Sequence, residues 1–149
     1  MDDTSFIQEG ELMGNNMELG YEMFCYQCEQ TAGGKGCTKL GVCGKTPEIA
    51  GLQDLLIFQI KGISCYAKTF IEQEQHVDKS IVTFIENALF TTLTNVNFDA
   101  DAHVKLLRQS QEIKETLKSS VGEINNPTYH ATYKLPNDKN EMLKDAYIA

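Results

Sequence analysis

Residues 46–65 read TPEIAGLQDLLIFQIKGISC, and this stretch sets the fold expected for the chain. Thr46 and Pro47 are typical of the N-cap and the first position of a helix. Apolar residues then recur at intervals of three or four, which places them on one helix face. The stripe consists of Ile49, Leu52, Leu56, Ile60 and Ile63, widened by Leu55, Phe58 and Cys65. We therefore expect a helix that is buried along most of its length.

Two further amphipathic helices are expected downstream, with Asp78 and Asp99 as their N-caps and Gly122 as the end of the second. The stripe of the first contains Ile81, Phe84, Ile85, Ala88 and Leu89, with Leu93 as a further candidate. The stripe of the second contains Leu106, Ser110, Ile113, Leu117 and Val121. No segment alternates apolar and polar residues over a sustained run, so strands are at most a minor component. The expected fold class is all-α, with the three helices packed as a bundle.

Four regions can be distinguished along the chain. Residues 1–22 form an acidic, polar leader that contains no Lys or Arg, and residues 23–45 form a loop rich in cysteine and glycine. Residues 46–122 hold the three-helix bundle. Residues 123–149 hold an extended, Tyr-rich segment and the start of a further helix at Lys139. Because that helix would be cut off by the end of the chain, we expect the chain to stop within a larger architecture.

The composition excludes several classes of protein. A chain of 149 residues with 42% apolar residues is long and hydrophobic enough for one folded domain. Its net charge of −8 argues against binding to nucleic acid or to an anionic membrane surface. No apolar run approaches the roughly 20 residues that span a bilayer. Because the leader lacks the basic start and apolar core of a secretory signal, we expect a cytoplasmic protein with reduced thiols.

The loop at residues 23–45 reads MFCYQCEQTAGGKGCTKLGVCGK and holds four of the chain's five cysteines. Cys25, Cys28, Cys37 and Cys43 follow the spacing C-x2-C-x8-C-x5-C. Four thiolates can hold one zinc ion tetrahedrally or an iron–sulfur cluster. The unequal gaps and the many glycines favour the cluster, because the backbone can then approach the sulfurs and donate N–H groups to them. The spacing leaves zinc open.

The segments MFCYQCEQT and GCTKLGVCGK, together with the LQDLL of residues 52–56, resemble the N-terminal end of the hybrid cluster proteins, also called prismane proteins or hydroxylamine reductases. The resemblance runs from Met23 to the end of the chain. It implies that the four loop cysteines are ligands of a [4Fe–4S] cubane, as in the form of the motif found in anaerobes. Another branch has a longer third gap and a [2Fe–2S] centre. Since the family begins at Met-Phe-Cys, residues 1–22 are interpreted as a flexible leader read through from an early start codon, with a functional extension as the alternative.

Members of this family reduce hydroxylamine to ammonia, and nitric oxide reduction has been proposed for them. The resemblance places that chemistry at a second, hybrid iron–sulfur–oxygen cluster, whose His, Glu and Cys ligands belong to later domains. No cysteine follows Cys65 here, so we assign no catalytic residue and expect the chain alone to be inactive. The chain would be an electron-transfer domain whose partners are the remaining domains or an electron donor protein. The alternatives are a stand-alone iron–sulfur carrier and a zinc-stabilised helical interaction domain.

The remaining metal-binding residue types carry weaker signals. Cys65 lies on the apolar face of the first helix and is expected to be a buried structural thiol. His76, His103 and His130 show no metal-ligand spacing, so each is expected at the surface.

Three lysines, Lys35, Lys39 and Lys45, stand among the loop cysteines of an otherwise acidic chain. They form a basic rim that would offset the negative charge of a cluster or receive an acidic electron donor. Ordinary solvated lysines explain the pattern equally well.

Overall fold

The structure is a computed structural model that describes residues 22–149. Its helices are α2 (Pro47–Glu72), α3 (Lys79–Thr91), α4 (Ala100–Val121), α5 (Tyr129–Thr132) and α6 (Lys139–Asp145), with 3-10 turns η1 (Ala32–Gly34) and η2 (Ala146–Ile148). No strand occurs in these residues, and the extended pairing among them is one isolated bridge between Cys25 and Cys37. The expected all-α fold is confirmed. The leader expected over residues 1–22 lies, apart from Glu22, outside the described residues.

The three long helices begin at the predicted caps. The side chains of Thr46, Asp78 and Asp99 each accept a hydrogen bond from a backbone N–H in the first turn of α2, α3 and α4, respectively. These bonds satisfy N–H groups that have no partner within the helix. α4 ends at Gly122, where a φ of 78° stops the helix at little steric cost.

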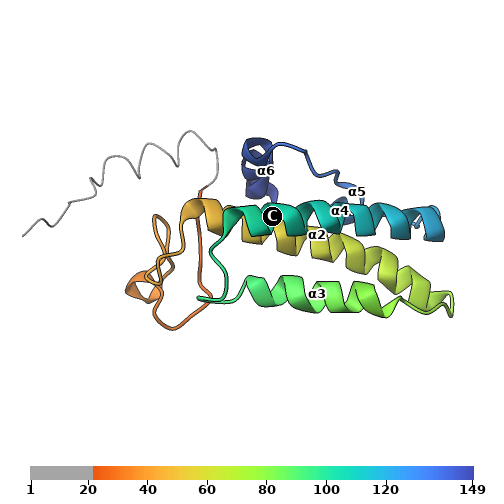
Figure 1. The fold of residues 1–149 in the computed structure, drawn as a ribbon, viewed down its shortest axis with the longest axis horizontal. Helices are drawn as coiled ribbons and strands as arrows, with labels where there is room; N and C mark the ends of the chain where they lie inside the picture. The colour runs from red at the N-terminus through yellow and green to blue at the C-terminus, as the bar shows by residue number, and fades with distance from the viewer. Residues whose placement is uncertain (1–21) are drawn as a thin grey trace, which may run out of the picture.

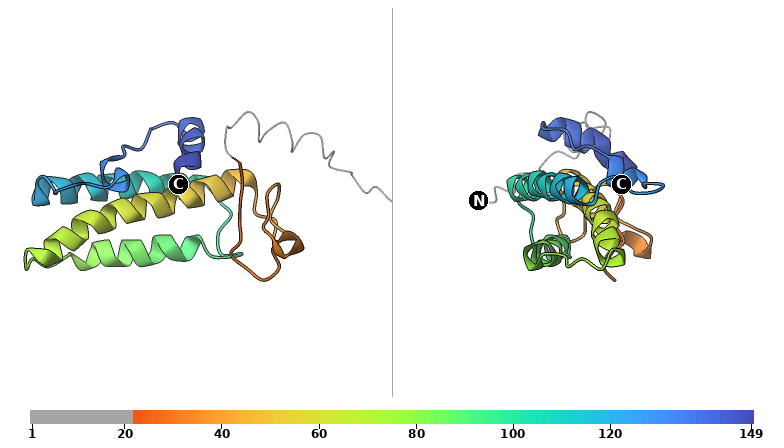
Figure 2. Two further views of the ribbon diagram at one scale, coloured as in Figure 1. Left: turned by 180° about the vertical axis from the view of Figure 1, so that it is seen from behind. Right: turned by 90° about the vertical axis from the view of Figure 1, so that its right-hand side faces the viewer.

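Helix α2 is the centre of the molecule (Figure 1). It packs most extensively against α4, it also contacts α5, α6 and η2, and its contact with α3 is slight. The cysteine-rich loop lies at one end of the long helices, beside the start of α2 and the connection between α3 and α4, and the two views of Figure 2 show the same arrangement. The fold thus separates a helical body from a cysteine-bearing end.

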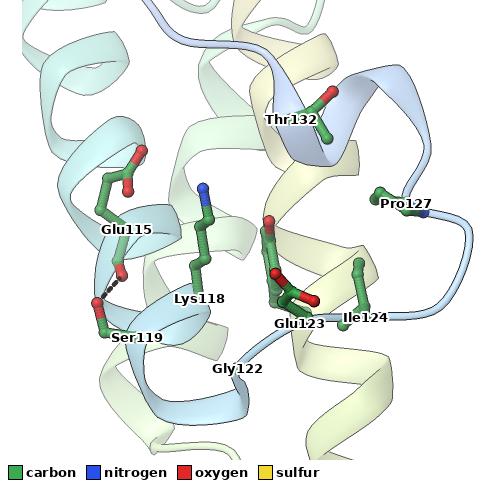
Figure 3. Close-up of a pocket in the computed structure, with 9 residues that line it drawn as sticks. Glu115, Lys118, Ser119, Gly122, Glu123, Ile124, Pro127 and Thr132 are labelled. Carbon is green, nitrogen blue, oxygen red and sulfur yellow. Dashed lines mark hydrogen bonds between the residues drawn. The ribbon is translucent and has the colours of Figure 1, made fainter.

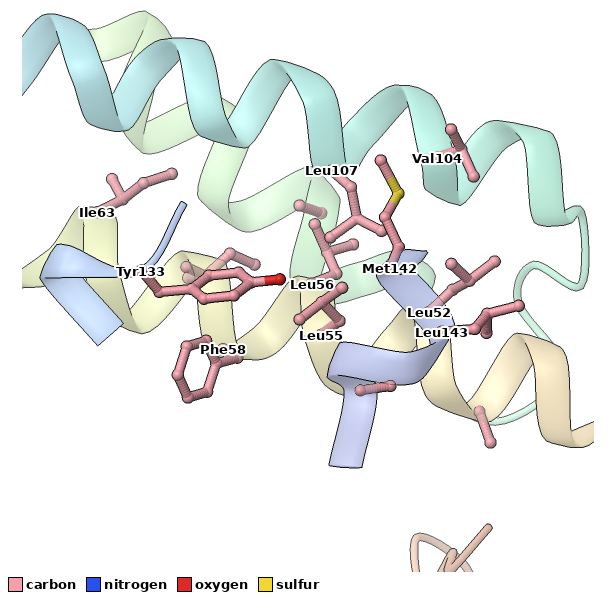
Figure 4. Packing of buried hydrophobic residues seen from close by; sticks show 14 of the residues in the cluster. Leu52, Leu55, Leu56, Phe58, Ile63, Val104, Leu107, Tyr133, Met142 and Leu143 are labelled. Carbon is pink, nitrogen blue, oxygen red and sulfur yellow. The ribbon is translucent and has the colours of Figure 1, made fainter. Parts of the chain in front are cut away.

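The core is built around α2, which is buried along most of its length as expected (Figure 4). Its fully buried side chains include Leu52, Leu55, Leu56 and Ile63 of α2, Leu107 of α4, and Met142 and Leu143 of α6. Helix α6 begins at Lys139 as expected, and its two core residues pack toward α2. None of the helices in residues 22–149 combines the length and apolar character needed to cross a membrane.

The buried face of α4 differs from the expected stripe. Ser110 and Leu117 are buried as predicted, but Leu106, Ile113 and Val121 are only half-buried. The buried positions are His103, Val104, Leu107, Ser110, Lys114 and Leu117. Polar residues therefore occupy core positions, which a stripe traced through apolar residues does not detect.

His103 is fully buried, so its expected surface location is wrong. Its Nδ1 lies 2.7 Å from the carbonyl oxygen of Asp99, and its Nε2 lies 3.4 Å from Nε2 of Gln53. The Gln53 amide also donates to the carbonyls of Thr91 and Asn97, at 3.3 and 3.2 Å. This polar contact ties the α3–α4 connection to α2 at the end where the cysteine loop lies.

The segment expected to be extended after Gly122 contains the single helical turn α5. Aromatic rings hold this turn on α2: the Phe58 ring centroid lies 4.4 Å from that of His130 and 5.5 Å from that of Tyr133. His130 is thus half-buried, whereas His76 is exposed as expected.

Candidate metal centre

The backbone of the loop pairs two of the four predicted ligands. Cys25 and Cys37 exchange both N–H to carbonyl hydrogen bonds, at 3.0 and 2.9 Å. The Thr31 hydroxyl donates to the carbonyl of Cys25 at 3.0 Å, and the Thr31 N–H donates to the carbonyl of Cys28 at 3.2 Å. Because these bonds turn the chain back on itself, cysteines from the two halves of the loop become neighbours.

The sulfur of Cys37 is surrounded by hydrogen-bond donors. The N–H of Ala32 lies 3.4 Å from Sγ, and the Thr31 hydroxyl lies 3.6 Å from it. The Ala32 N–H, the Thr31 hydroxyl and the N–H of Val42 lower the pKa of the Cys37 thiol, against the opposing effect of burial, and the positive charge of Lys45 adds to the lowering. Metal ligation requires the thiolate form, and this environment favours it.

Glycines bring the backbone close to Cys43. The N–H of Gly41 donates to the carbonyl of Lys45 and the N–H of Gly44 donates to the carbonyl of Gly41, both at 2.8 Å. A Cβ added to Gly41 would lie 3.1 Å from Sγ of Cys43, tighter than nearly all real Cβ contacts. Gly44 has a φ of 89°, which residues with side chains rarely adopt. The tight turn around Cys43 therefore requires these glycines.

The four loop cysteines are free thiols, with Cys37 buried and Cys25, Cys28 and Cys43 half-buried. Within residues 22–149, no three Cys, His, Asp or Glu side chains are closed around a point that could hold a single metal ion. The structure thus places the four thiols on one short loop and pairs two of them through the backbone. As an all-thiol donor set with N–H groups directed at sulfur, these residues fit an iron–sulfur cluster.

Cys65 stands apart from this loop. It lies about 27 Å along α2 from the start of the helix, at 1.5 Å per residue. It is half-buried rather than buried, and its Sγ lies 3.2 Å from the hydroxyl of Thr128.

Lys45 differs from the other two lysines of the predicted basic rim, because it is buried. Lys35 and Lys39 are exposed, as ordinary solvated lysines are, but Lys45 is only 2% exposed. Its Nζ donates to Oε1 of Gln27 at 3.1 Å. The sequence feature that indicates this burial is its position directly before the cap of a buried helix.

A separate cavity of about 560 Å³ lies between α2, the end of α4 and the segment that leads to α5 (Figure 3). Glu115, Lys118 and Glu123 line it together with apolar atoms of Ile124 and Pro127. It contains no cysteine and lies away from the loop end of the molecule, so it contributes nothing to the thiol site.

Comparison with known proteins gives a consistent result. The model of the Prismane/CO dehydrogenase family matches residues 23–148 of this chain. The chain is 47% identical over 105 residues to a hydroxylamine reductase of Bacteroides thetaiotaomicron, covering 70% of this chain and 19% of that protein. It is 50% identical over 96 residues to one of Parabacteroides distasonis (64% and 17%) and 55% identical over 84 residues to one of Thermotoga maritima (56% and 19%).

The chain therefore spans about a fifth of the length of these relatives. The family match covers the cysteine loop and every helix that the structure describes. Both the cysteine loop and the helical body thus fall inside the matched region. The chain belongs to the Prismane/CO dehydrogenase family.

Proposed function

We propose that the loop binds a [4Fe–4S] cluster through Cys25, Cys28, Cys37 and Cys43, and that the chain is the iron–sulfur electron-transfer domain of a hybrid cluster protein-type oxidoreductase. The observation that carries the proposal is the gathering of four free thiols on one loop, with N–H and O–H donors beside Cys37 Sγ. Family membership and the relatives' name, hydroxylamine reductase, support the oxidoreductase class.

The cluster, when bound, supplies one-electron redox chemistry. The protein's part is to hold the thiolates and to set their surroundings. The Ala32 N–H and the Thr31 hydroxyl place positive dipole ends near the Cys37 sulfur, which stabilises negative charge there. The Cys25–Cys37 bridge fixes the distance between two ligands without using their side chains.

The position of the loop suits exchange of electrons with a partner. Three of its cysteines are half-buried rather than enclosed, and the loop lies at the end of the helical body. We propose that the partner is either the further domains of a longer hybrid cluster protein or a separate electron donor protein in the cytoplasm. Reduction of hydroxylamine to ammonia, or of nitric oxide, would take place at a second cluster in those domains.

Anaerobic reconstitution of the 149-residue chain with ferrous iron and sulfide tests the cluster. We expect about four iron and four sulfide per chain, and a broad absorbance near 400 nm, roughly, that bleaches on reduction. Changing any one of the four loop cysteines to serine should lower the bound iron, and Cys65→Ser is the matched control that should not. A chain that retains zinc but gains no colour, or four loop variants that keep a full cluster, would overturn the proposal.

A further inference from the structure

Lys45 has an unusual electrostatic position. Its side chain is 2% exposed, and its ammonium donates to the neutral amide oxygen of Gln27. The two ion pairs found within residues 22–149 involve other lysines, Lys68 and Lys139. A buried ammonium that faces no anion is strongly unfavourable, because it has lost its hydration without gaining a counter-charge.

Lys114, the other buried lysine of the described residues, shows how such a charge is satisfied without an anion. Its Nζ donates to three oxygen atoms, Oε1 of Gln59 and the carbonyls of His130 and Tyr133. An ammonium has three N–H donors, so Lys114 uses all of them. Lys45 donates to one acceptor in residues 22–149, the side-chain oxygen of Gln27. Two of its three N–H donors, and its positive charge, therefore remain available to the cysteine loop.

The geometry places Lys45 between the two halves of the cysteine loop. A Cβ added to Gly41 would lie 3.0 Å from Cβ of Lys45 and 3.1 Å from Sγ of Cys43, so the lysine stem and this sulfur flank the same point. At its other end, the ammonium reaches Gln27, the residue directly before Cys28. The side chain thus runs from the Cys43 side of the loop to the Cys28 side.

We propose that Lys45 is the buried counter-charge of the bound cluster and a positioning residue that raises its reduction potential; this inference rests on the function proposed above. Four thiolates and a cluster core carry a net negative charge that increases by one on reduction. A fixed positive charge within the protein, where water does not screen it, favours the more negative, reduced state.

The test is a spectroscopic redox titration of the reconstituted 149-residue chain. Lys45→Met removes the charge and keeps most of the stem, and Lys45→Arg keeps the charge. For Lys45→Met we expect the ratio of reduced to oxidised cluster at a fixed applied potential to be about tenfold lower than in the wild type. For a one-electron couple this equals a midpoint potential ~59 mV more negative. Lys45→Arg should titrate near the wild type.

Lys35→Met is the matched control, because Lys35 is exposed and stands two residues from Cys37, as Lys45 stands two residues from Cys43. Lys35→Met should shift the reduction potential less than Lys45→Met does, and this shift should vanish at high salt, which screens exposed charges. The shift of Lys45→Met should persist at the same salt concentration. A Lys45→Met chain with a normal cluster and the wild-type potential would overturn the proposal.

Gln27→Glu provides a second route that leaves Lys45 in place, for the case that Lys45→Met does not retain the cluster. The new carboxylate would neutralise the ammonium, so the potential should fall by more than in Gln30→Glu, which adds the same charge to the exposed neighbourhood of Cys28. Equal shifts would overturn the role of Lys45. A wild-type chain that gains no redox-active cluster would instead overturn the proposed function, and the inference with it.

Discussion

Lys114 is held in the interior by oxygen atoms and by an aromatic ring. It is 2% exposed, and its Nζ lies 5.5 Å from the ring centroid of Tyr133. Burial lowers the pKa of Lys114 to about 8, because the charged form loses its hydration; Glu115 opposes the lowering and Lys118 adds to it. The residue therefore titrates in a range where an exposed lysine stays protonated.

This shift predicts a pH dependence of the free energy of unfolding. Between pH 8 and about 10 the unfolded chain binds more protons at this lysine than the folded chain does, so its contribution to stability rises with pH. Below pH 8 both states are protonated and the contribution is constant. Urea unfolding of the wild type and of Lys114→Met should show a difference that grows in favour of the wild type over this window.

The window ends near pH 10 because the lysine then loses its proton in the unfolded chain as well. Lys105→Met is the control, since Lys105 is exposed on the same helix and is not among the charges that shift the pKa of Lys114, so it should leave the pH profile unchanged. A difference between wild type and Lys114→Met that is flat or falls from pH 8 to 10 would contradict the assignment.

Single residues divide sharply in how well the sequence predicts them. The helix caps were predictable, because a cap side chain bonds backbone groups only two or three residues away. His103, Lys45 and Lys114 were not, because each is buried only by virtue of partners far along the chain. Apolar periodicity carries no information about such polar pairs.

At the scale of elements, α5 lies directly against α2 at Gly62. A Cβ added there would lie 2.2 Å from the carbonyl oxygen of His130 and 3.0 Å from Cδ of Lys114. Since the first contact is with backbone, it cannot be relieved by turning a side chain. The absence of a side chain at position 62 is what allows α5 to pack on α2.

Gly62→Ala is therefore expected to destabilise the fold by about 1–3 kcal/mol, the range for overpacked cores. This prediction opposes helix propensity, by which alanine would stabilise α2 by about 1 kcal/mol. The measurement is the free energy of unfolding in urea. Ser64→Ala, an exposed change on the same helix, should stay within about 0.5 kcal/mol; a Gly62→Ala protein as stable as the wild type would show that α5 is free to shift.

The elements themselves were largely predictable, and their contacts were not. The starts of α2, α3 and α4 and the end at Gly122 agree with the sequence patterns. The turn α5 was not predicted, because its four residues show no periodicity. It forms where the rings of Tyr129 and Tyr133 pack against the ring of Phe58. The packing of α6 on α2 likewise depends on Met142 and Leu143 meeting a surface that no local pattern describes.

At the scale of the whole molecule, the chain holds one thiol-rich loop and no second set of thiolates. Cys65 is the only cysteine outside the loop, and no cysteine follows it. We predict that the reconstituted chain accepts and releases electrons but does not convert hydroxylamine to ammonia when supplied with a reduced viologen dye. Ammonia production is the measurement, and cycles of cluster bleaching and recovery are the control for redox competence. Turnover at the rate of a full-length relative would contradict this prediction.

The residues of the motif at 23–45 indicated the family by resemblance, and with it the four candidate ligands, because both the residues and the cysteine spacing are properties of the sequence itself. Its placement beside the start of α2 and the α3–α4 connection required the fold. The contact of Gln53 with His103 and the carbonyls of Thr91 and Asn97, which fastens that connection, joins residues from two parts of the chain.

The backbone bridge between Cys25 and Cys37 also bears on how such a centre is assembled. It closes the intervening chain into a ring of hydrogen-bonded backbone in which two ligands already face the same region. The entropic cost of closing that ring arises when the chain folds, so it does not reduce the affinity for the metal. Incoming iron therefore meets a receptor in which the backbones of two ligands, Cys25 and Cys37, are already joined.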